Sequence, residues 1–122
     1  MPTATQTQPV TLAQLKSAIE GRNAAALIAC YRDDAVVRVI DRDNPPSKPR
    51  ELKGKAAIAA FYDDVCARAM THHVETGISS GNRLAFTQAC NYENGTRVFC
   101  SAMIELDDGR IARQTNVQAW DS

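Results

Sequence analysis

From His72 to the C-terminal region, the chain follows one pattern, in which side chains alternate with a period of two. Turn sequences rich in Gly, Asn, Asp and Ser interrupt this pattern at residues 79–82, 94–95 and 107–109. Strands with one packed face and one solvated face have this period, and short turns between them produce hairpins. We therefore expect four long antiparallel strands that build a single sheet.

The first part of the chain carries helical periodicity instead. Thr11 is a suitable N-cap for an amphipathic helix. Residues 35–40 are rich in β-branched side chains and predict a strand, whereas residues 41–50 contain three prolines and predict a loop. Three helices are expected: one between Thr11 and Gly21, one from Ala24 to about Arg32, and one from Lys55 to about Ala69. Helices followed by hairpins indicate the α+β class.

Charge and composition exclude two classes of protein. Fourteen basic side chains balance fourteen acidic ones, whereas a nucleic-acid-binding domain normally carries a basic excess, so we expect no nucleic-acid partner. No apolar run approaches the ~20 residues of a membrane-spanning helix, so we expect no membrane contact. The length of 122 residues fits one domain. We place this domain at residues 11–122, after a disordered lead-in at residues 1–10 that has no signal-peptide features.

The four cysteines, Cys30, Cys66, Cys90 and Cys100, form no C-x-x-C pair and no zinc-site spacing. With no export signal, reduced thiols in a cytoplasmic protein are expected. The chain also has no dinucleotide-binding or phosphate-loop motif. We therefore expect neither a metal nor a cofactor.

The Asn94-Gly95 pair predicts which way two of the strands face. A two-residue turn here places Ala89 opposite Cys100 and Cys90 on the other face, which excludes a disulfide between Cys90 and Cys100. The face with Ala89 and Cys100 also carries Asn91, and its small, mostly apolar side chains suit a wall that is packed by helices or lines a cavity.

The other face of this hairpin presents Phe86, Phe99 and Met103. Because a sheet covered by helices on one side leaves this face toward water, we expect a second copy of the chain to cover it and form a homodimer. The alternative is a monomer, since a few apolar residues on an exposed face are normal.

Three segments carry a resemblance to a known family: residues 29–37 (ACYRDDAVV), 54–62 (GKAAIAAFY) and 108–120 (DGRIARQTNVQAW). The chain resembles the nuclear transport factor 2 (NTF2)-like superfamily, especially its SnoaL-like and ketosteroid isomerase-like branch. The resemblance implies a cone-shaped, curved, mixed sheet packed on three N-terminal helices around one pocket for a small hydrophobic molecule. It implies no single reaction, because the fold hosts isomerases, dehydratases, cyclases, epoxide hydrolases and binding modules.

The catalytic positions of ketosteroid isomerase are mostly apolar in this chain. The carboxylate base falls on Val39, the oxyanion tyrosine near Leu15, and the protonated aspartate on Ala102 or Ile104. The supporting tyrosine of the third helix is retained, as Tyr62. We therefore do not expect steroid isomerisation by that mechanism.

The resemblance places the last strand along the pocket, and the period of two gives its three amides one face. Each unpaired buried amide costs about 1–3 kcal/mol, so either these amides bind a polar group or this face is the wetter one. The expected ligand-contacting residues are Tyr31, Asn91, Cys100, Gln114, Asn116, Gln118 and Trp120.

Three residues are the catalytic candidates. His72 and Val74 are alternate residues of one predicted strand, so both point to the inner face. There His72 can act as a general base or serve as a hydrogen-bonded core residue. Asp41 ends the first strand at the pocket mouth and is either a displaced carboxylate base or a solvated loop residue. Tyr62 either donates to an oxyanion or packs in the core.

Two functions remain open from the sequence. The first is a cofactor-independent lyase or isomerase that acts on an apolar or polyketide-like molecule. In it, His72 or Asp41 moves a proton, Tyr62 and Asn91 hold the oxyanion, and the last strand orients the ligand. The second is a binding or protein-interaction module without chemistry, which the missing carboxylate pair favours.

Overall fold

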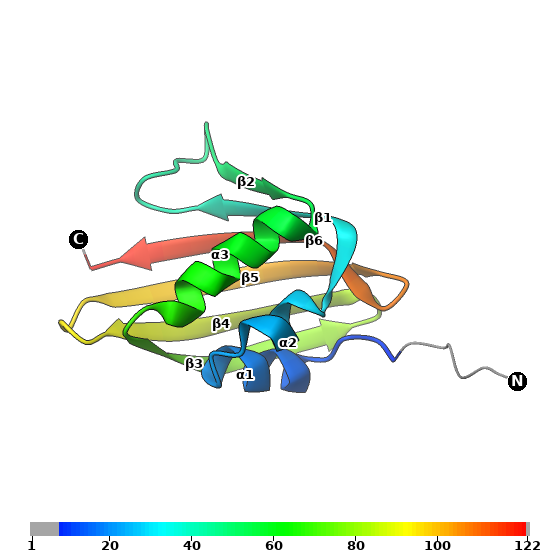
Figure 1. Ribbon diagram of the computed structural model, residues 1–122, viewed down its shortest axis with the longest axis horizontal. Helices are drawn as coiled ribbons and strands as arrows, with labels where there is room; N and C mark the ends of the chain where they lie inside the picture. Colours follow the sequence, from blue (N-terminus) through cyan, green and yellow to red (C-terminus); the bar gives the residue numbers. More distant parts are fainter. Residues whose placement is uncertain (1–7, 122) are drawn as a thin grey trace, which may run out of the picture.

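The computed structural model describes residues 8–121 and shows one mixed sheet with the helices on one of its faces (Figure 1). The helices are α1 (Leu12–Glu20), α2 (Ala24–Ile28) and α3 (Lys55–Ala67), and the strands are β1 (Tyr31–Ile40), β2 (Arg50–Lys53), β3 (Met70–Ser80), β4 (Arg83–Tyr92), β5 (Arg97–Asp107) and β6 (Arg110–Trp120). The strand order is β2-β1-β6-β5-β4-β3. Strands β1 and β6 pair in parallel, and the other neighbours are antiparallel. The predicted α+β class and the curved, mixed sheet packed on three helices are confirmed.

Side-chain caps explain where the first two helices begin. Thr11 and Gln14 form a capping box: the Thr11 hydroxyl accepts from the Gln14 N–H at 3.1 Å, and the Gln14 carboxamide accepts from the Thr11 N–H at 2.9 Å. Asn23 accepts from the Ala26 N–H at 3.1 Å and caps α2. None of the helices within residues 8–121 is long and apolar enough to cross a membrane.

The second helix is shorter than the sequence predicts. It ends at Ile28, and Tyr31 already belongs to β1, where it pairs with Ile111 of β6. The prediction of a helix to about Arg32 is therefore wrong. Pairing with a neighbouring strand overrides the helical spacing of this short segment.

The turn between β4 and β5 contains three residues, 93–95. The Tyr92 N–H donates to the Thr96 carbonyl at 2.9 Å, and the Asn94 side chain accepts from the Thr96 N–H at 2.9 Å. Gly95 takes the left-handed conformation, with a φ of 93°. Three-residue hairpin loops with glycine in this conformation are the second common solution for a sequence of this kind.

This extra loop residue shifts the predicted pairing by one position. Cys90 lies opposite Val98, and a one-residue shift turns the β4 side chains to the other face relative to β5. Phe86 and Cys90 are buried, and Asn91 is exposed. The predicted outward orientation of Phe86 and the inward orientation of Asn91 are therefore wrong, and Cys90 shares the inner face with Cys100.

A β-bulge in β3 produces a second shift. Val74 pairs with Gln88 and Thr76 with Thr87, so Glu75 is the extra residue. After the bulge, the even-numbered side chains of β3 point to the outer face instead of the inner face. Ile78, which was predicted to point inward, is therefore 72% exposed on the outer face. His72 lies before the bulge and keeps the inner face.

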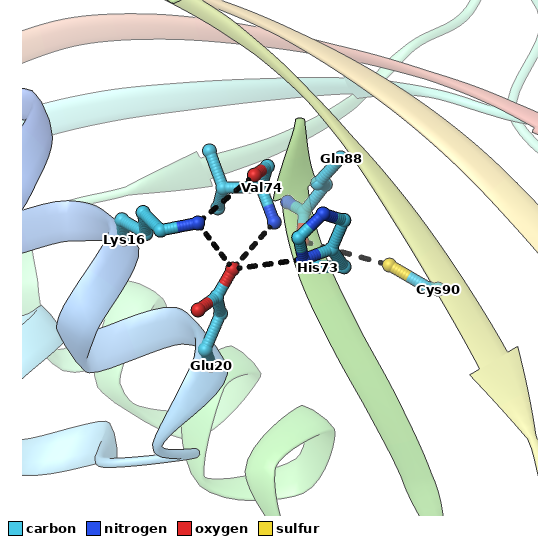
Figure 2. Close-up of polar contacts among 6 residues, drawn as sticks. All are labelled: Lys16, Glu20, His73, Val74, Gln88 and Cys90. Carbon is cyan, nitrogen blue, oxygen red and sulfur yellow. Dashed lines mark hydrogen bonds and ion pairs between the residues drawn. The ribbon is translucent and has the colours of Figure 1, made fainter. Parts of the chain in front are cut away.

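The C-terminal end of α1 is held against this bulge (Figure 2). The Glu20 carboxylate accepts from the Val74 N–H at 2.8 Å and from Lys16 at 3.0 Å, and it lies 3.4 Å from the His73 imidazole. The hydrogen bond from Val74 and the adjacent Lys16 lower the pKa of Glu20. This contact fixes α1 over the inner face, next to the strand that carries His72.

The core lies between the helices and the inner face of the sheet, with Ile58 and Ile111 completely buried. The disordered lead-in predicted at residues 1–10 falls mostly outside the described residues. Val10, however, is 3% exposed, and its N–H donates to the Gly109 carbonyl at 3.0 Å. The ordered domain therefore begins before Thr11.

Candidate functional site

A cavity of about 260 Å³ lies between the helices and the inner face of the sheet. Small-molecule sites usually have about 300–1,000 Å³, so this volume suits a small ligand. Its lining combines apolar groups from α1, α2 and α3 with polar groups from β3, β4 and β6. The sequence-predicted residues that line it are Tyr31, Asp41, Tyr62, His72, Cys100, Gln114, Asn116, Gln118 and Trp120.

The inner part of the cavity holds a directional chain of hydrogen bonds. The Tyr31 hydroxyl donates to Gln114 Oε1 at 2.5 Å and lies 2.7 Å from the Tyr62 hydroxyl. Because Tyr31 has one proton, Tyr62 donates in the second contact. Gln114 Nε2 in turn donates to Asn116 Oδ1 at 2.9 Å. The chain ends at the Asn116 amide nitrogen, which can donate into the cavity.

Both tyrosines are neutral at physiological pH. Burial raises the pKa of Tyr31 well above its usual value, and the neighbouring Tyr62 hydroxyl raises it further. Burial also raises the pKa of Tyr62. Among the described residues, every buried side-chain nitrogen or oxygen has a hydrogen-bond partner. The polar residues of the last strand therefore satisfy one another, and Gln114 reaches across to β1.

His72 faces the cavity and meets a thiol. Its Nδ1 lies 3.2 Å from Cys90 Sγ, directly across the β3–β4 ladder. Cys100 reaches the same inner face from β5, and both cysteines are free thiols. His72 thus has a titratable partner instead of the backbone partner typical of a structural histidine.

Aromatic and cationic side chains form the outer part of the cavity. Trp120 stacks on Tyr92 with ring centroids 5.8 Å apart, and the Arg42 guanidinium lies 4.2 Å above the Trp120 ring. Gln118 Oε1 accepts from the Trp120 indole N–H at 3.1 Å. Arg68 donates to the Tyr92 hydroxyl at 2.8 Å. This arrangement fixes the single tryptophan of the chain in the cavity wall.

Asp41 and Asn91 occupy less suitable positions. Asp41 Oδ1 accepts from the backbone N–H of Asp43 and from the backbone and side chain of Asn44, all at 2.9 Å. These contacts are typical of an aspartate that caps a turn. Asn91 is exposed on the outer face and is not part of the cavity lining.

The positions that would carry ketosteroid isomerase carboxylates and its oxyanion tyrosine are buried apolar residues. Leu15 and Ile104 line the cavity, and Val39 is 1% exposed. Within residues 8–121, no group of three or more His, Cys, Asp or Glu side chains is placed to hold a metal ion.

The family follows from a comparison of the sequence with family models. Residues 12–114 match the model of the SnoaL-like domain. The chain belongs to this family. No curated protein matches the chain in sequence.

Several solved structures share the fold of this SnoaL-like domain. An NTF2-like protein of unknown function from Mesorhizobium loti superposes with a TM-score of 0.76 at 15% identity, over 88% of this chain and 87% of the other. A candidate ketosteroid isomerase from Kribbella flavida gives 0.72 at 17% identity, over 88% and 73%. A candidate polyketide cyclase from Sinorhizobium meliloti gives 0.65 at 19% identity, over 84% and 89%. At these identities the likeness shows the fold alone.

Sequence reasoning missed Cys90 and Tyr92 as parts of the site. Both would have followed from a three-residue loop at residues 93–95, because Cys90 then turns inward with His72. The Asn94-Gly95 pair was the only signal in the sequence for this turn. It is compatible with a two-residue loop and with a three-residue loop, so it did not determine which face Cys90 and Tyr92 occupy.

Proposed function

We propose that this SnoaL-like domain binds a small, mostly apolar carbonyl compound and moves a proton on it without a cofactor, as an isomerase, lyase or cyclase does. One observation carries the proposal: an imidazole and a chain of neutral donors face the same cavity, in which the helices supply apolar side chains. That combination supplies a base and a place for developing negative charge. Related folds described as a candidate ketosteroid isomerase and a candidate polyketide cyclase support the reaction class.

The residues take distinct roles in this proposal. His72 removes the proton, because the other histidine, His73, is exposed, contacts Glu20 and does not line the cavity. Asn116, at the end of the donor chain, holds the developing oxyanion, and Tyr62 assists if its proton turns from Tyr31 to the ligand. Gln118 and Trp120 orient the ligand at the entrance. Asp41 organises the loop at the mouth instead of acting as the base.

The second candidate function is ligand binding without chemistry. The observation that favours it is the apolar character of the family's carboxylate positions, together with the turn-capping contacts of Asp41. Both functions require a ligand in the cavity, and proton transfer distinguishes them.

Ligand entry can be followed through the fluorescence of Trp120. Titration with 2-tetralone, a small bicyclic ketone, is expected to change this fluorescence in a saturable way. Ile104→Phe fills part of the cavity and should weaken binding at least about tenfold, the equivalent of ~1.4 kcal/mol. Ile78→Phe makes the same substitution on the outer face and should leave binding unchanged. Equal binding by both variants would contradict a ligand site in the cavity.

The proposal includes a homodimer formed through the outer sheet face. Strand register places Ile78, Ala85, Met103 and Thr115 in one row across four strands. The exposed large apolar residues of this face are Ile78 (72%), Met103 (62%), Phe99 (47%) and Val117 (46%). Exposed large apolar residues on one face of a β-sheet suit a self-complementary interface around a two-fold axis. Phe86 is buried and takes no part.

Light scattering after size-exclusion chromatography tests this interface. The wild-type protein is expected to have twice the mass of the chain, and Met103→Glu, which adds two carboxylates near the two-fold axis, is expected to raise the dimer dissociation constant at least about tenfold. Ala56→Glu on the exposed side of α3 is the control and should remain dimeric. A monomeric wild-type protein at micromolar concentration would exclude the dimer.

A further inference from the structure

Cys90 is a nucleophilic side chain that the proton-transfer reaction does not use. Its sulfur lies 3.2 Å from His72 Nδ1, and it lines the cavity although its exposed fraction is 4%. A structural buried cysteine normally sits among apolar groups. Here the imidazole of His72 lies directly opposite. A further contact runs from the Cys90 thiol to Gln88 Oε1 at 3.5 Å (Figure 2). The pairing of a thiol with an imidazole inside a cavity is the arrangement of an activated nucleophile.

We propose that Cys90 adds to the β-carbon of an α,β-unsaturated carbonyl compound that enters the cavity, with His72 as its base and proton carrier. This inference goes beyond the proposed function, because a covalent thioether forms. The cavity fits this ligand class: side chains of the helices give part of its wall an apolar surface for the carbon skeleton, and amide donors on β6 are available for the carbonyl oxygen. Gln118 lies directly opposite Cys100, and its Oε1 already accepts from Trp120, which leaves its amide nitrogen to donate.

The charged and titratable surroundings of Cys90 support a thiolate. A hydrogen bond from the Cys100 thiol on β5 lowers the pKa of Cys90 most, burial opposes it, and His72 on β3 lowers it further, to about 5. The same contact with Cys90 raises the pKa of Cys100, so Cys90 is the member of the pair that ionises. At the cavity entrance, Arg68 at the end of α3 contributes a positive charge through Tyr92 of β4.

The addition is balanced without an oxidant. His72 takes the thiol proton, and the thiolate attacks the β-carbon and forms the C–S bond. The π electron pair of the C=C bond moves toward the carbonyl oxygen as an enolate, which an amide N–H of β6 stabilises. The His72 imidazolium then returns its proton to the α-carbon. In total, S–H adds across C=C, and the reverse sequence releases the ligand.

Reaction rates at two pH values distinguish this thiol from an ordinary one. At pH 6 a thiol with a pKa of about 5 is almost fully ionised. Its thiolate fraction is about 300 times that of a thiol with the usual pKa of ~8.5. Its thiolate is about 25- to 55-fold less nucleophilic, given a Brønsted coefficient of ~0.4–0.5. The thiol with the lower pKa therefore reacts about five- to tenfold faster than an ordinary thiol at pH 6. Above about pH 7 the ordinary thiol reacts faster.

Methyl vinyl ketone, a very small enone, is the probe, and peptide mass spectrometry identifies the modified cysteine. Cys66 is the internal comparison, since it is more exposed than Cys90 and burial raises its pKa. At pH 6, Cys90 is expected to react at least about fivefold faster than Cys66, and at pH 8.5 more slowly. Faster modification of Cys66 at every pH, or no adduct on Cys90, would overturn the proposal.

Two variants separate the roles of the neighbouring imidazoles. His72→Gln should slow the modification of Cys90 at pH 6, because only the Cys100 thiol then lowers the pKa of Cys90, whereas His73→Gln, one residue away and outside the cavity lining, should not. Equal rates in both variants would exclude His72 as the base. 2-Tetralone has no C=C bond conjugated to its carbonyl and cannot form this adduct. Proton transfer on 2-tetralone and thioether formation with methyl vinyl ketone can therefore fail independently.

Discussion

The His72→Gln variant is expected to exchange the α-protons of 2-tetralone with solvent deuterium about 10²–10⁴ times more slowly than the wild-type protein. The carbon acid needs a base inside the cavity, and His72 is the imidazole that lines it. Glutamine retains the approximate size and hydrogen-bonding capacity of histidine but cannot accept a proton near neutral pH. Proton NMR in D₂O follows the exchange directly and requires no knowledge of the natural substrate.

His73→Gln is the matched control for this experiment. His73 is exposed and lies 3.4 Å from Glu20 on the surface, so its replacement should leave the exchange rate within about twofold of wild type. Thermal unfolding of both variants verifies that the fold is intact. If both variants exchange at the wild-type rate, His72 is not the base. Saturable binding with no exchange above the rate in buffer would instead support the function of a non-catalytic binding domain.

The fold could be predicted well because its main signals are local. The N-cap residues Thr11 and Asn23 mark the starts of two helices, and the change from helical periodicity to a period of two marks the start of the sheet. The turn at Asp108-Gly109 forms as expected, with positive φ at both residues (57° and 81°). Segments with consistent local preferences and tertiary environment are the ones that a single sequence describes reliably.

The candidate site could be predicted only in part, because side-chain direction depends on counting residues along each strand. Any single insertion reverses every later side chain. One extra residue in the loop at residues 93–95 moved Asn91 out of the cavity and Cys90 into it. One bulge residue, Glu75, placed Ile78 on the outer face. His72 precedes the bulge, and Gln114, Asn116, Gln118 and Trp120 follow the last irregularity in β6. Counting alternate residues therefore assigns these side chains to the cavity correctly.

Replacement of Gln114 by leucine is expected to lower the free energy of unfolding by about 1–3 kcal/mol. Gln114 is 6% exposed and accepts the Tyr31 proton at 2.5 Å. Leucine is close in size and leaves no large cavity, so the principal loss is the acceptor of a buried hydroxyl. Tyr31→Phe should be destabilising for the complementary reason, since it leaves Gln114 Oε1 and the Tyr62 proton without their partner. Urea unfolding followed by circular dichroism measures both.

The double variant Tyr31→Phe/Gln114→Leu decides between a coupled pair and two separate packing effects. When both partners of a buried hydrogen bond are removed, neither end of that bond is left unsatisfied. The Tyr62 proton and Asn116 Oδ1 lose a partner in the double variant as they do in the single ones. The double variant should therefore be more stable than the sum of the two single changes predicts, by about 0.5–3 kcal/mol. Additive losses would mean that the two residues act only through their volume. In that case the donor chain to Asn116 would not be held in one direction, and the oxyanion role of Asn116 would lose its structural support.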